Sequence, residues 1–140
     1  MAKAGLKILI VDDFETVRLL FIKCLGELGY STVHEADNGE DALRMIKAAS
    51  DQKIPYDLIF CDWNMPLMNG LETLVTLRKW ERKGESQTIP FVMVTANSDE
   101  SAVIDAMREG VSEYLVKPFD AGSLQKTIER VLNRLTQHVA

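Results

Sequence analysis

Chemically active side chains stand directly after four short apolar runs of this 140-residue sequence. The residues that follow the runs are, in chain order, Asp12 with Asp13, then Asp62, Thr95 and Lys117. A short apolar run is typical of a buried parallel strand, and in open α/β sheets the ligand site lies beyond the carboxyl ends of the strands. If the runs are neighbouring strands, these side chains meet at one edge. Carboxylates that lie close together repel one another unless a cation or a ligand offsets their charge. The pattern therefore predicts a site for a divalent metal and a phosphoryl group.

Stretches with the apolar spacing of helices separate these runs, and a further strand is expected over residues 32–36. Three helices are expected to begin after a capping residue: the second after Asn38, the fourth after Ser98 and the last after Asp120. The first and fourth helices are expected to end at Gly29 and Gly110. The second is expected to end at the polar loop Ser50–Pro55, and the third in the charged stretch 79–86, which contains Gly84. Asn, Ser and Asp favour the position before a helix, and glycine favours the position that ends it. Strand and helix thus alternate about five times. This order predicts an α/β fold with a five-stranded parallel sheet, helices on both faces and a flavodoxin-like (βα)5 arrangement.

Length and composition indicate one domain over residues 1–140, with no room for an output domain. The formal net charge of −5 gives no sign of a surface that binds polyanions, so nucleic acid is not an expected partner. No stretch approaches the roughly 20 apolar residues of a membrane span. The few residues before the first strand leave no room for a signal peptide. We therefore expect a cytoplasmic protein with no membrane partner.

The two cysteines and the two histidines are not expected to take part in the site. Cys24 falls on the core face of a helix and Cys61 lies within an apolar run, so both are expected to be buried thiols. The sequence has no metal-binding Cys/His spacing. His34 and His138 are isolated and are expected to be solvated or packed.

Taken together, the site elements resemble the receiver domain of two-component response regulators. The stretches that carry the resemblance are VDDFETVR at 11–18, DWNMP at 62–66, TA at 95–96 and VKPF at 116–119, and the resemblance covers nearly the whole chain. Within that family, the first, second and last stretches are most similar to the chemotaxis regulators. Asp12 and Asp13 alone would indicate a helix start, where acidic residues are favoured. The other elements favour the phosphoryl site.

The resemblance implies that Asp62 is the phosphoacceptor and that the donor is a phosphohistidine on a sensor histidine kinase. A carboxylate is a competent nucleophile toward a phosphoryl group and gives an acyl phosphate. The family also implies Mg²⁺, which prefers oxygen ligands, bound by Asp13, Asp62 and the backbone carbonyl of Asn64. Asp12 would hold a coordinated water or orient the ligands. Such a protein catalyses its own phosphorylation and dephosphorylation and is not otherwise an enzyme.

Two further residues would contact the transferred group. The Lys117 ammonium would offset the negative charge of the phosphoryl group, and the Thr95 hydroxyl would donate to one of its oxygens. The family further implies a cis peptide bond between Lys117 and Pro118.

Phosphorylation is expected to be read out through Thr95 and Tyr114. In the family, the threonine moves toward the phosphoryl group and an aromatic residue of the last strand turns inward. The alternative for Tyr114 is a core residue with no switching role. Asn64 and Asn97 match the family positions that tune hydrolysis of the acyl phosphate. Neither is charged, so we expect dephosphorylation of intermediate speed.

The output partner is the least defined part of the prediction. Motor-binding chemotaxis regulators carry two lysines shortly after Thr-Ala, whereas this chain has the acidic pair Asp99 and Glu100. Binding to an acidic flagellar switch protein would therefore be weaker. Chemotaxis with a flagellar partner, and a phosphatase as a further partner, is our first hypothesis. The alternative is a stand-alone receiver that acts as a phosphate sink or as a connector to a non-motor partner.

Two enzyme classes are disfavoured by the motifs. A haloacid-dehalogenase-type phosphatase places a second Asp two residues after its nucleophile as general acid, and that position is Asn64 here. A nucleotide-binding protein would need a glycine-rich phosphate loop, and neither common pattern is present.

Overall fold

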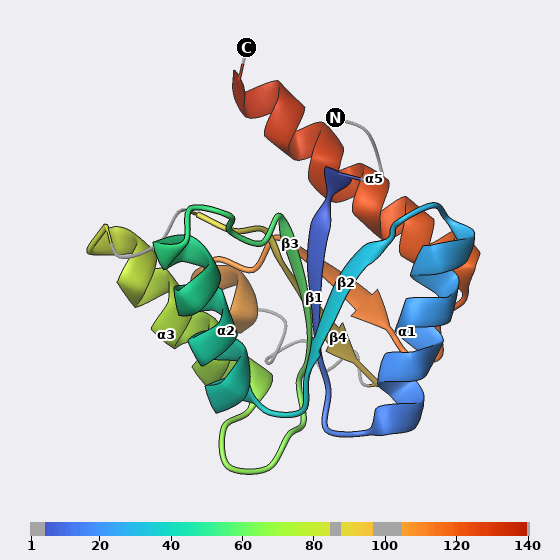
Figure 1. Cartoon of the computed structure of the whole chain (residues 1–140), viewed down its shortest axis with the longest axis horizontal. Coiled ribbons are helices and arrows are strands. Elements are labelled where there is room, and N and C mark those ends of the chain that lie inside the picture. Colours follow the sequence, from blue (N-terminus) through green and yellow to red (C-terminus); the bar gives the residue numbers. More distant parts are fainter. Residues whose placement is uncertain (1–4, 85–87, 97–104, 140) are drawn as a thin grey trace.

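Five parallel strands form one sheet in the computed structural model, which describes residues 5–84, 88–96 and 105–139, with side chains up to Leu135. The strands are β1 (Lys7–Val11), β2 (Thr32–Ala36), β3 (Leu58–Asp62), β4 (Phe91–Thr95) and β5 (Glu113–Val116). They lie in the order β2-β1-β3-β4-β5, and every neighbouring pair is parallel (Figure 1). The predicted flavodoxin-like sheet is confirmed, and β2 has the expected bounds.

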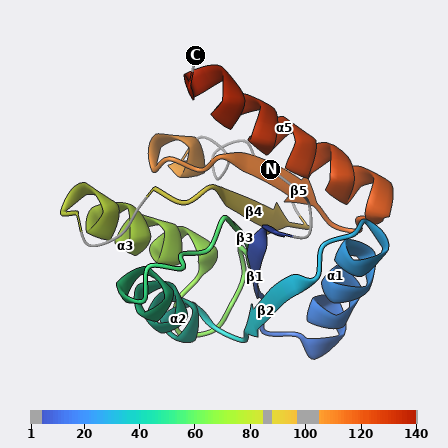
Figure 2. The same cartoon turned by 45° about the horizontal axis from the view of Figure 1, so that its top comes forward.

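Helices cover both faces of the sheet (Figure 2). The helices are α1 (Glu15–Glu27) and α5 (Ala121–Val139) on one face, and α2 (Gly39–Asp51) and α3 (Gly70–Arg82) on the other. The two helices on each face contact one another. Residues 105–108 are also helical and precede β5. Among the described residues, no helix is long and apolar enough to cross a membrane.

Two hydrophobic cores form because successive residues of a strand point to opposite faces of the sheet. On β1, Leu9 and Val11 belong to the core beneath α2 and α3, whereas Ile8 and Ile10 belong to the core beneath α1 and α5. All four side chains are at most 1% exposed. Burial on both faces explains why the central strands are unbroken apolar runs.

Capping residues define several helix ends. Asn38 and Asp120 each accept a hydrogen bond of 2.8 Å from the backbone amide three residues later, as predicted. Asn69, which was not predicted, forms a full capping box at the start of α3. The glycines expected at helix ends, Gly29, Gly84 and Gly110, all have positive φ.

One helix runs further than the sequence predicted. The expected loop Ser50–Pro55 begins later, because α2 continues through Asp51, whereas α3 ends at Arg82 within the charged stretch 79–86, and Gly84 follows it as expected. Polar and charged residues on the exposed side of a helix do not end it. The predicted cap Ser98 lies outside the described residues.

A buried arginine joins the end of α3 to two distant segments. Arg78 donates two hydrogen bonds to the Gly110 carbonyl, at 2.8 and 3.0 Å, and one to the Ile89 carbonyl at 2.8 Å. Its Nη1 is also 2.7 Å from the Glu81 carboxylate, which accepts the Ile89 amide at 2.9 Å. The Arg78 and Glu81 side chains are 10% and 5% exposed. This network holds the segments that lead into β4 and β5.

Candidate functional site

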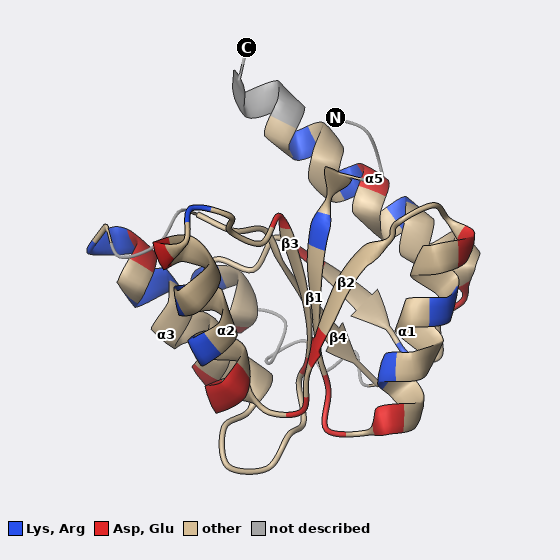
Figure 3. Cartoon of the chain, viewed as in Figure 1, with Lys and Arg blue, Asp and Glu red and all other residues tan. Residues whose placement is uncertain are grey.

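Three carboxylates from two adjacent strands meet at the carboxyl edge of the sheet. Asp12 and Asp13 directly follow β1, and Asp62 is the last residue of the neighbouring β3. One oxygen of each carboxylate lies within 4.8 Å of the others. Asp12 and Asp62 are buried and Asp13 is half-buried. Figure 3 shows acidic segments at this edge, where β1 runs into α1 and β2 into α2. The three acids therefore converge as the strand order requires.

Lys117 reaches these acids from the end of β5. Its Nζ lies 2.9 Å from Asp62 Oδ1 and 3.2 Å from Asp12 Oδ2. The backbone amide of Lys117 donates a 2.8 Å hydrogen bond to the carbonyl of Thr95, which ties the loop to β4. The Lys117–Pro118 peptide bond is cis, as the family resemblance implies.

Burial and charge act in opposite directions on the pKa values of this ion pair. Burial raises the pKa of the Asp62 carboxyl above its ordinary value; the hydrogen bond from Lys117 opposes the rise, and the charge of Asp12 adds to it. For Lys117, burial alone lowers the pKa of the ammonium, but the hydrogen bond with Asp62 and the charges of both acids leave it raised. Lys117 is therefore a fixed positive charge at neutral pH.

Each hydrogen-bonding group of Asp12 has a partner. Its amide donates to the Ala36 carbonyl at 3.1 Å, and its Oδ1 accepts the Phe14 amide at 2.9 Å. Its Oδ2 pairs with Lys117, and its backbone carbonyl accepts a 2.7 Å hydrogen bond from Arg18 Nη1. Asp12 is thus held from β2, α1 and β5 at once. No role for Arg18 was predicted, because nothing in its spacing shows which backbone group it contacts.

The loop after Asp62 turns tightly back on the strand. The Trp63 amide donates to the Val94 carbonyl, and the Gly70 amide donates to the Trp63 carbonyl, both at 2.9 Å. A Cβ on Gly70 would lie 2.5 Å from the Asp62 carbonyl oxygen and 2.7 Å from Met93 Sδ. Only glycine fits there without a shift of the backbone. No local sequence pattern reveals this close approach of Gly70 to Asp62.

Thr95 and Tyr114 lie on one face of the sheet. Thr95 is buried at the end of β4, and Tyr114 is half-buried on β5. The register pairs Met93 with Tyr114 and Thr95 with Val116, so both side chains point to the α2 and α3 face. Burial raises the pKa of the Tyr114 hydroxyl. The two residues of the predicted switch therefore lie diagonally on one face of adjacent strands, two positions apart in the register.

The donor set of the acidic cluster fits a hard divalent cation. All three side chains offer carboxylate oxygens, the ligands that Mg²⁺ prefers. Asp13 Oδ1 is buried and has no hydrogen-bond partner among the described residues. Such an atom is costly unless a partner or an ion satisfies it. Asn64, whose carbonyl was expected to complete the site, is exposed in the loop that follows β3.

Several other predicted residues have a definite place. Cys24 and Cys61 are buried free thiols, and burial raises the pKa of Cys61 well above its ordinary value, so it is no nucleophile at neutral pH. The Nδ1 atom of His34, on the edge strand β2, lies 2.7 Å from the Tyr56 hydroxyl. Asn97, predicted to tune hydrolysis, lies outside the described residues, as do Asp99 and Glu100.

A five-stranded parallel sheet with an Asp-Asp pair, a central Asp and a Lys at its carboxyl edge defines a receiver domain. Residues 8–129 match the family model of the response regulator receiver domain, and the chain belongs to this family. It is similar to chemotaxis protein CheY-3 of Vibrio cholerae, with 39% identity over 131 residues, 94% of this chain and 95% of that protein. Chemotaxis protein CheY of Pseudomonas aeruginosa is also 39% identical, over 93% of this chain and 98% of that protein. The chain is thus a response regulator receiver related to chemotaxis proteins.

Solved structures agree with this assignment. CheY4 of Vibrio cholerae is 32% identical, with a TM-score of 0.76 over 90% of this chain and 98% of that chain. The receiver domain of the histidine kinase CKI1 from Arabidopsis thaliana, in complex with Mg²⁺ and BeF3⁻, is 26% identical. Its TM-score is 0.80 over 94% of this chain and 92% of that chain.

Proposed function

We propose that this response regulator accepts a phosphoryl group on Asp62 from a phosphohistidine of a sensor histidine kinase. The observation that carries the proposal is the cluster of three carboxylates with Lys117 at the carboxyl edge of the sheet. Membership of the receiver family supports it, since receiver domains are phosphoacceptors in signalling. The chain would promote its own phosphorylation and dephosphorylation without being otherwise an enzyme.

The transfer needs a nucleophile and a way to offset spreading negative charge. An Asp62 oxygen would attack phosphorus as the bond to the histidine nitrogen breaks, and the histidine would leave with that electron pair. Charge spreads over the phosphoryl oxygens, so catalysis depends on positioning and electrostatics. Lys117, 2.9 Å from Asp62 Oδ1, is close enough to pair with a phosphoryl oxygen bound there. Thr95 would donate its hydroxyl to another oxygen.

Magnesium is the proposed cofactor. Asp12, Asp13, Asp62 and the backbone carbonyl of Asn64 would hold it, and the bound ion would supply positive charge against the phosphoryl oxygens. Asp13 Oδ1, which is buried without a hydrogen-bond partner among the described residues, supports a cation at this place. The Mg²⁺ and BeF3⁻ complex of the CKI1 receiver domain also supports it.

Intact-mass measurement tests the core of the proposal. The protein is incubated with acetyl phosphate and Mg²⁺, and one added phosphoryl group is expected. Asp62→Asn should show no added mass, and neither should the unaltered protein in EDTA. Asp37→Asn is the matched control, because Asp37 is exposed at the end of the neighbouring strand β2 and should leave phosphorylation unchanged. Phosphorylation of Asp62→Asn to the level of the control would show that another residue is the acceptor.

Thr95 and Tyr114 are the proposed route from the site to the output face, which is the face formed by the fourth helix, β5 and α5. Their place on one face of adjacent strands supports the coupling. Phosphorylation would draw the Thr95 hydroxyl toward Asp62 and open space for the Tyr114 ring. Beryllofluoride, which mimics the phosphoryl group, should therefore shift the ring resonances of Tyr114. Unchanged resonances in protein that binds beryllofluoride would contradict this route.

A flagellar switch protein is the first candidate for the partner, because the similar curated proteins are chemotaxis proteins. A phosphatase is a further candidate. The alternative, a phosphate sink or a connector to a non-motor partner, is favoured by the acidic residues Asp99 and Glu100. A pull-down with the amino-terminal peptide of a flagellar switch protein, with and without beryllofluoride, separates the two. Beryllofluoride-dependent capture supports the motor, and no capture in either state supports the alternative.

A further inference from the structure

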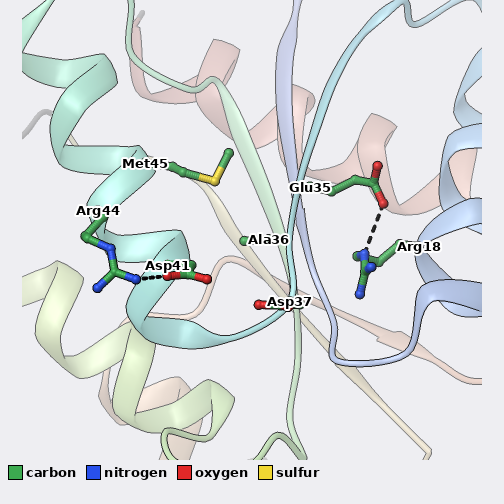
Figure 4. Close-up of a pocket in the computed structure, with 7 residues that line it drawn as sticks. All are labelled: Arg18, Glu35, Ala36, Asp37, Asp41, Arg44 and Met45. Atoms are coloured by element: carbon green, nitrogen blue, oxygen red, sulfur yellow. Dashed lines mark hydrogen bonds and ion pairs between the residues drawn. The ribbon is translucent and has the colours of Figure 1, made fainter.

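Arg18 connects the acidic cluster to a pocket beside it. The pocket, of about 420 Å³, is lined by Arg18, Glu35, Ala36, Asp37, Asp41, Arg44 and Met45 (Figure 4). Arg18 Nε lies 3.0 Å from Glu35 Oε1, and its Nη1 donates a 2.7 Å hydrogen bond to the Asp12 carbonyl. The Arg18 side chain is 15% exposed. One planar guanidinium therefore bridges the end of β2 and the turn after β1.

The carbonyl that Arg18 contacts belongs to the peptide unit between Asp12 and Asp13. A peptide unit is rigid and planar, so fixing its carbonyl also fixes the direction in which the chain leaves toward Asp13. The Asp12 amide is already held by the Ala36 carbonyl. The bond from Arg18 therefore helps to hold the Asp12–Asp13 turn, together with the bond from the Phe14 amide to Asp12 Oδ1.

Asp13 needs such a support more than Asp12 does. The Asp12 carboxylate is held by the Phe14 amide and by Lys117, whereas Asp13 Oδ1 has no hydrogen-bond partner in the described part of the chain. Its position then depends on the backbone that carries it. A charge-assisted hydrogen bond to that backbone is stronger than a neutral one. Glu35 keeps the guanidinium of Arg18 turned toward the carbonyl.

We infer that Arg18 is a positioning residue for metal binding by Asp13, an inference that rests on the proposed function. Arg18 does not touch the cation or the phosphoryl group. It presents the Asp12–Asp13 turn in the geometry that binds Mg²⁺. Loss of groups that orient metal ligands typically weakens metal binding 10- to 100-fold. The half-saturating Mg²⁺ concentration should therefore rise roughly tenfold or more in Arg18→Met.

Magnesium titration of the whole chain, followed by tryptophan fluorescence, measures this affinity because Trp63 directly follows Asp62. Arg44→Met is the matched control. Arg44 lines the same pocket and makes the same change of charge on substitution, but it pairs with Asp41 on α2 and not with the acidic cluster (Figure 4). Its Mg²⁺ affinity should equal that of the unaltered chain. Melting curves in EDTA verify that each variant is folded.

Phosphorylation kinetics separate positioning from a general loss of structure. With acetyl phosphate, Arg18→Met should need more Mg²⁺ for half-maximal rate but reach nearly the same rate at saturating Mg²⁺. Arg18→Lys keeps the charge but not the planar fork, so it should recover only part of the affinity. If Arg18→Lys binds Mg²⁺ as tightly as the unaltered chain, charge alone suffices and the positioning role is wrong.

The possible failures are distinguishable. If the unaltered chain shows no Mg²⁺ response and gains no phosphoryl mass, the proposed function fails. If it responds and Arg18→Met matches it or matches Arg44→Met, only the inference about Arg18 is overturned. A lower rate at saturating Mg²⁺ with unchanged Mg²⁺ affinity would also overturn it.

Discussion

Replacement of Asp13 by Asn should stabilise the metal-free protein. Asp13 is within 4.8 Å of the carboxylates of Asp12 and Asp62, and its Oδ1 has no hydrogen-bond partner among the described residues. Lys117 pairs with the other two acids. Removal of the Asp13 charge therefore relieves repulsion without breaking an ion pair found in the described residues.

The size of the effect follows from these distances. Two unit charges 4.8 Å apart repel by about 0.9 kcal/mol even at the dielectric constant of water, which is a lower limit because Asp13 Oδ1 is buried. Two such repulsions give about 1.7 kcal/mol, and the attraction of Asp13 to Lys117 cancels roughly half of this. We expect Asp13→Asn to raise the free energy of unfolding by about 1 kcal/mol in EDTA, or the melting temperature by about 3 °C.

Magnesium should reverse the order of stability. A ligand at a hundred times its dissociation constant stabilises the folded state by about 2.7 kcal/mol, and Asp13→Asn should lose most of this gain. Urea unfolding in EDTA and in excess Mg²⁺ measures both effects. Asp37→Asn, with the same change of charge on an exposed residue of the neighbouring loop, should behave as the unaltered chain. If Asp13→Asn is no more stable in EDTA, the repulsion assigned to Asp13 is wrong; if it still gains fully from Mg²⁺, Asp13 is not a metal ligand.

Three further predictions concern the surroundings of the site and its dependence on pH. Gly70→Ala places a Cβ 2.5 Å from the Asp62 carbonyl. It should lower the free energy of unfolding, measured in urea, by about 1–3 kcal/mol and should slow phosphorylation. A free energy of unfolding equal to that of the unaltered chain would show that the loop moves to accept the Cβ at no cost. Arg78→Met leaves the buried Glu81 carboxylate without its cation and should lower the free energy of unfolding by about 3–5 kcal/mol in the same assay. The double variant Arg78→Met with Glu81→Leu should recover part of this loss. Burial raises the pKa of the Asp62 carboxyl. Protons therefore compete with Mg²⁺ for this carboxylate at a higher pH than they would at an ordinary aspartate. The ionised carboxylate costs stability above its raised pKa, and protonation relieves that cost as the pH falls through this value. The rise in melting temperature caused by Mg²⁺ should therefore be largest near neutral pH and vanish as the pH falls. A rise that does not depend on pH would contradict metal binding by Asp62.

The sheet and the converging acids could be predicted because they depend on local patterns and on general topology. Unbroken apolar runs identify strands buried on both faces, and parallel strands place their following residues at one edge. Asp12 and Asp62 meet for this reason, although they are far apart in sequence. The capping roles of Asn38 and Asp120 are equally local, since each accepts an amide three residues later.

Contacts that depend on exact packing could not be predicted. Arg78 reaches the Gly110 carbonyl 32 positions away, and no local pattern reveals such a bond. The end of α2 was placed too early, because polar residues at the end of a helix resemble a loop in sequence. The close approach of Gly70 to the Asp62 carbonyl arises only once the two elements are packed.

The long reach of Lys117 has a consequence for the newly made protein. Its Nζ bridges Asp12, 105 positions earlier, and Asp62, so these groups meet only when β1, β3 and β5 are all in place. A chain still emerging from the ribosome carries both acids long before it carries their cation. Domains are made from the amino terminus at about 5–20 residues per second, which leaves the acids unpaired for several seconds. Nascent and truncated chains therefore lack the assembled site, and the ability to receive a signal reports that synthesis and folding have reached β5.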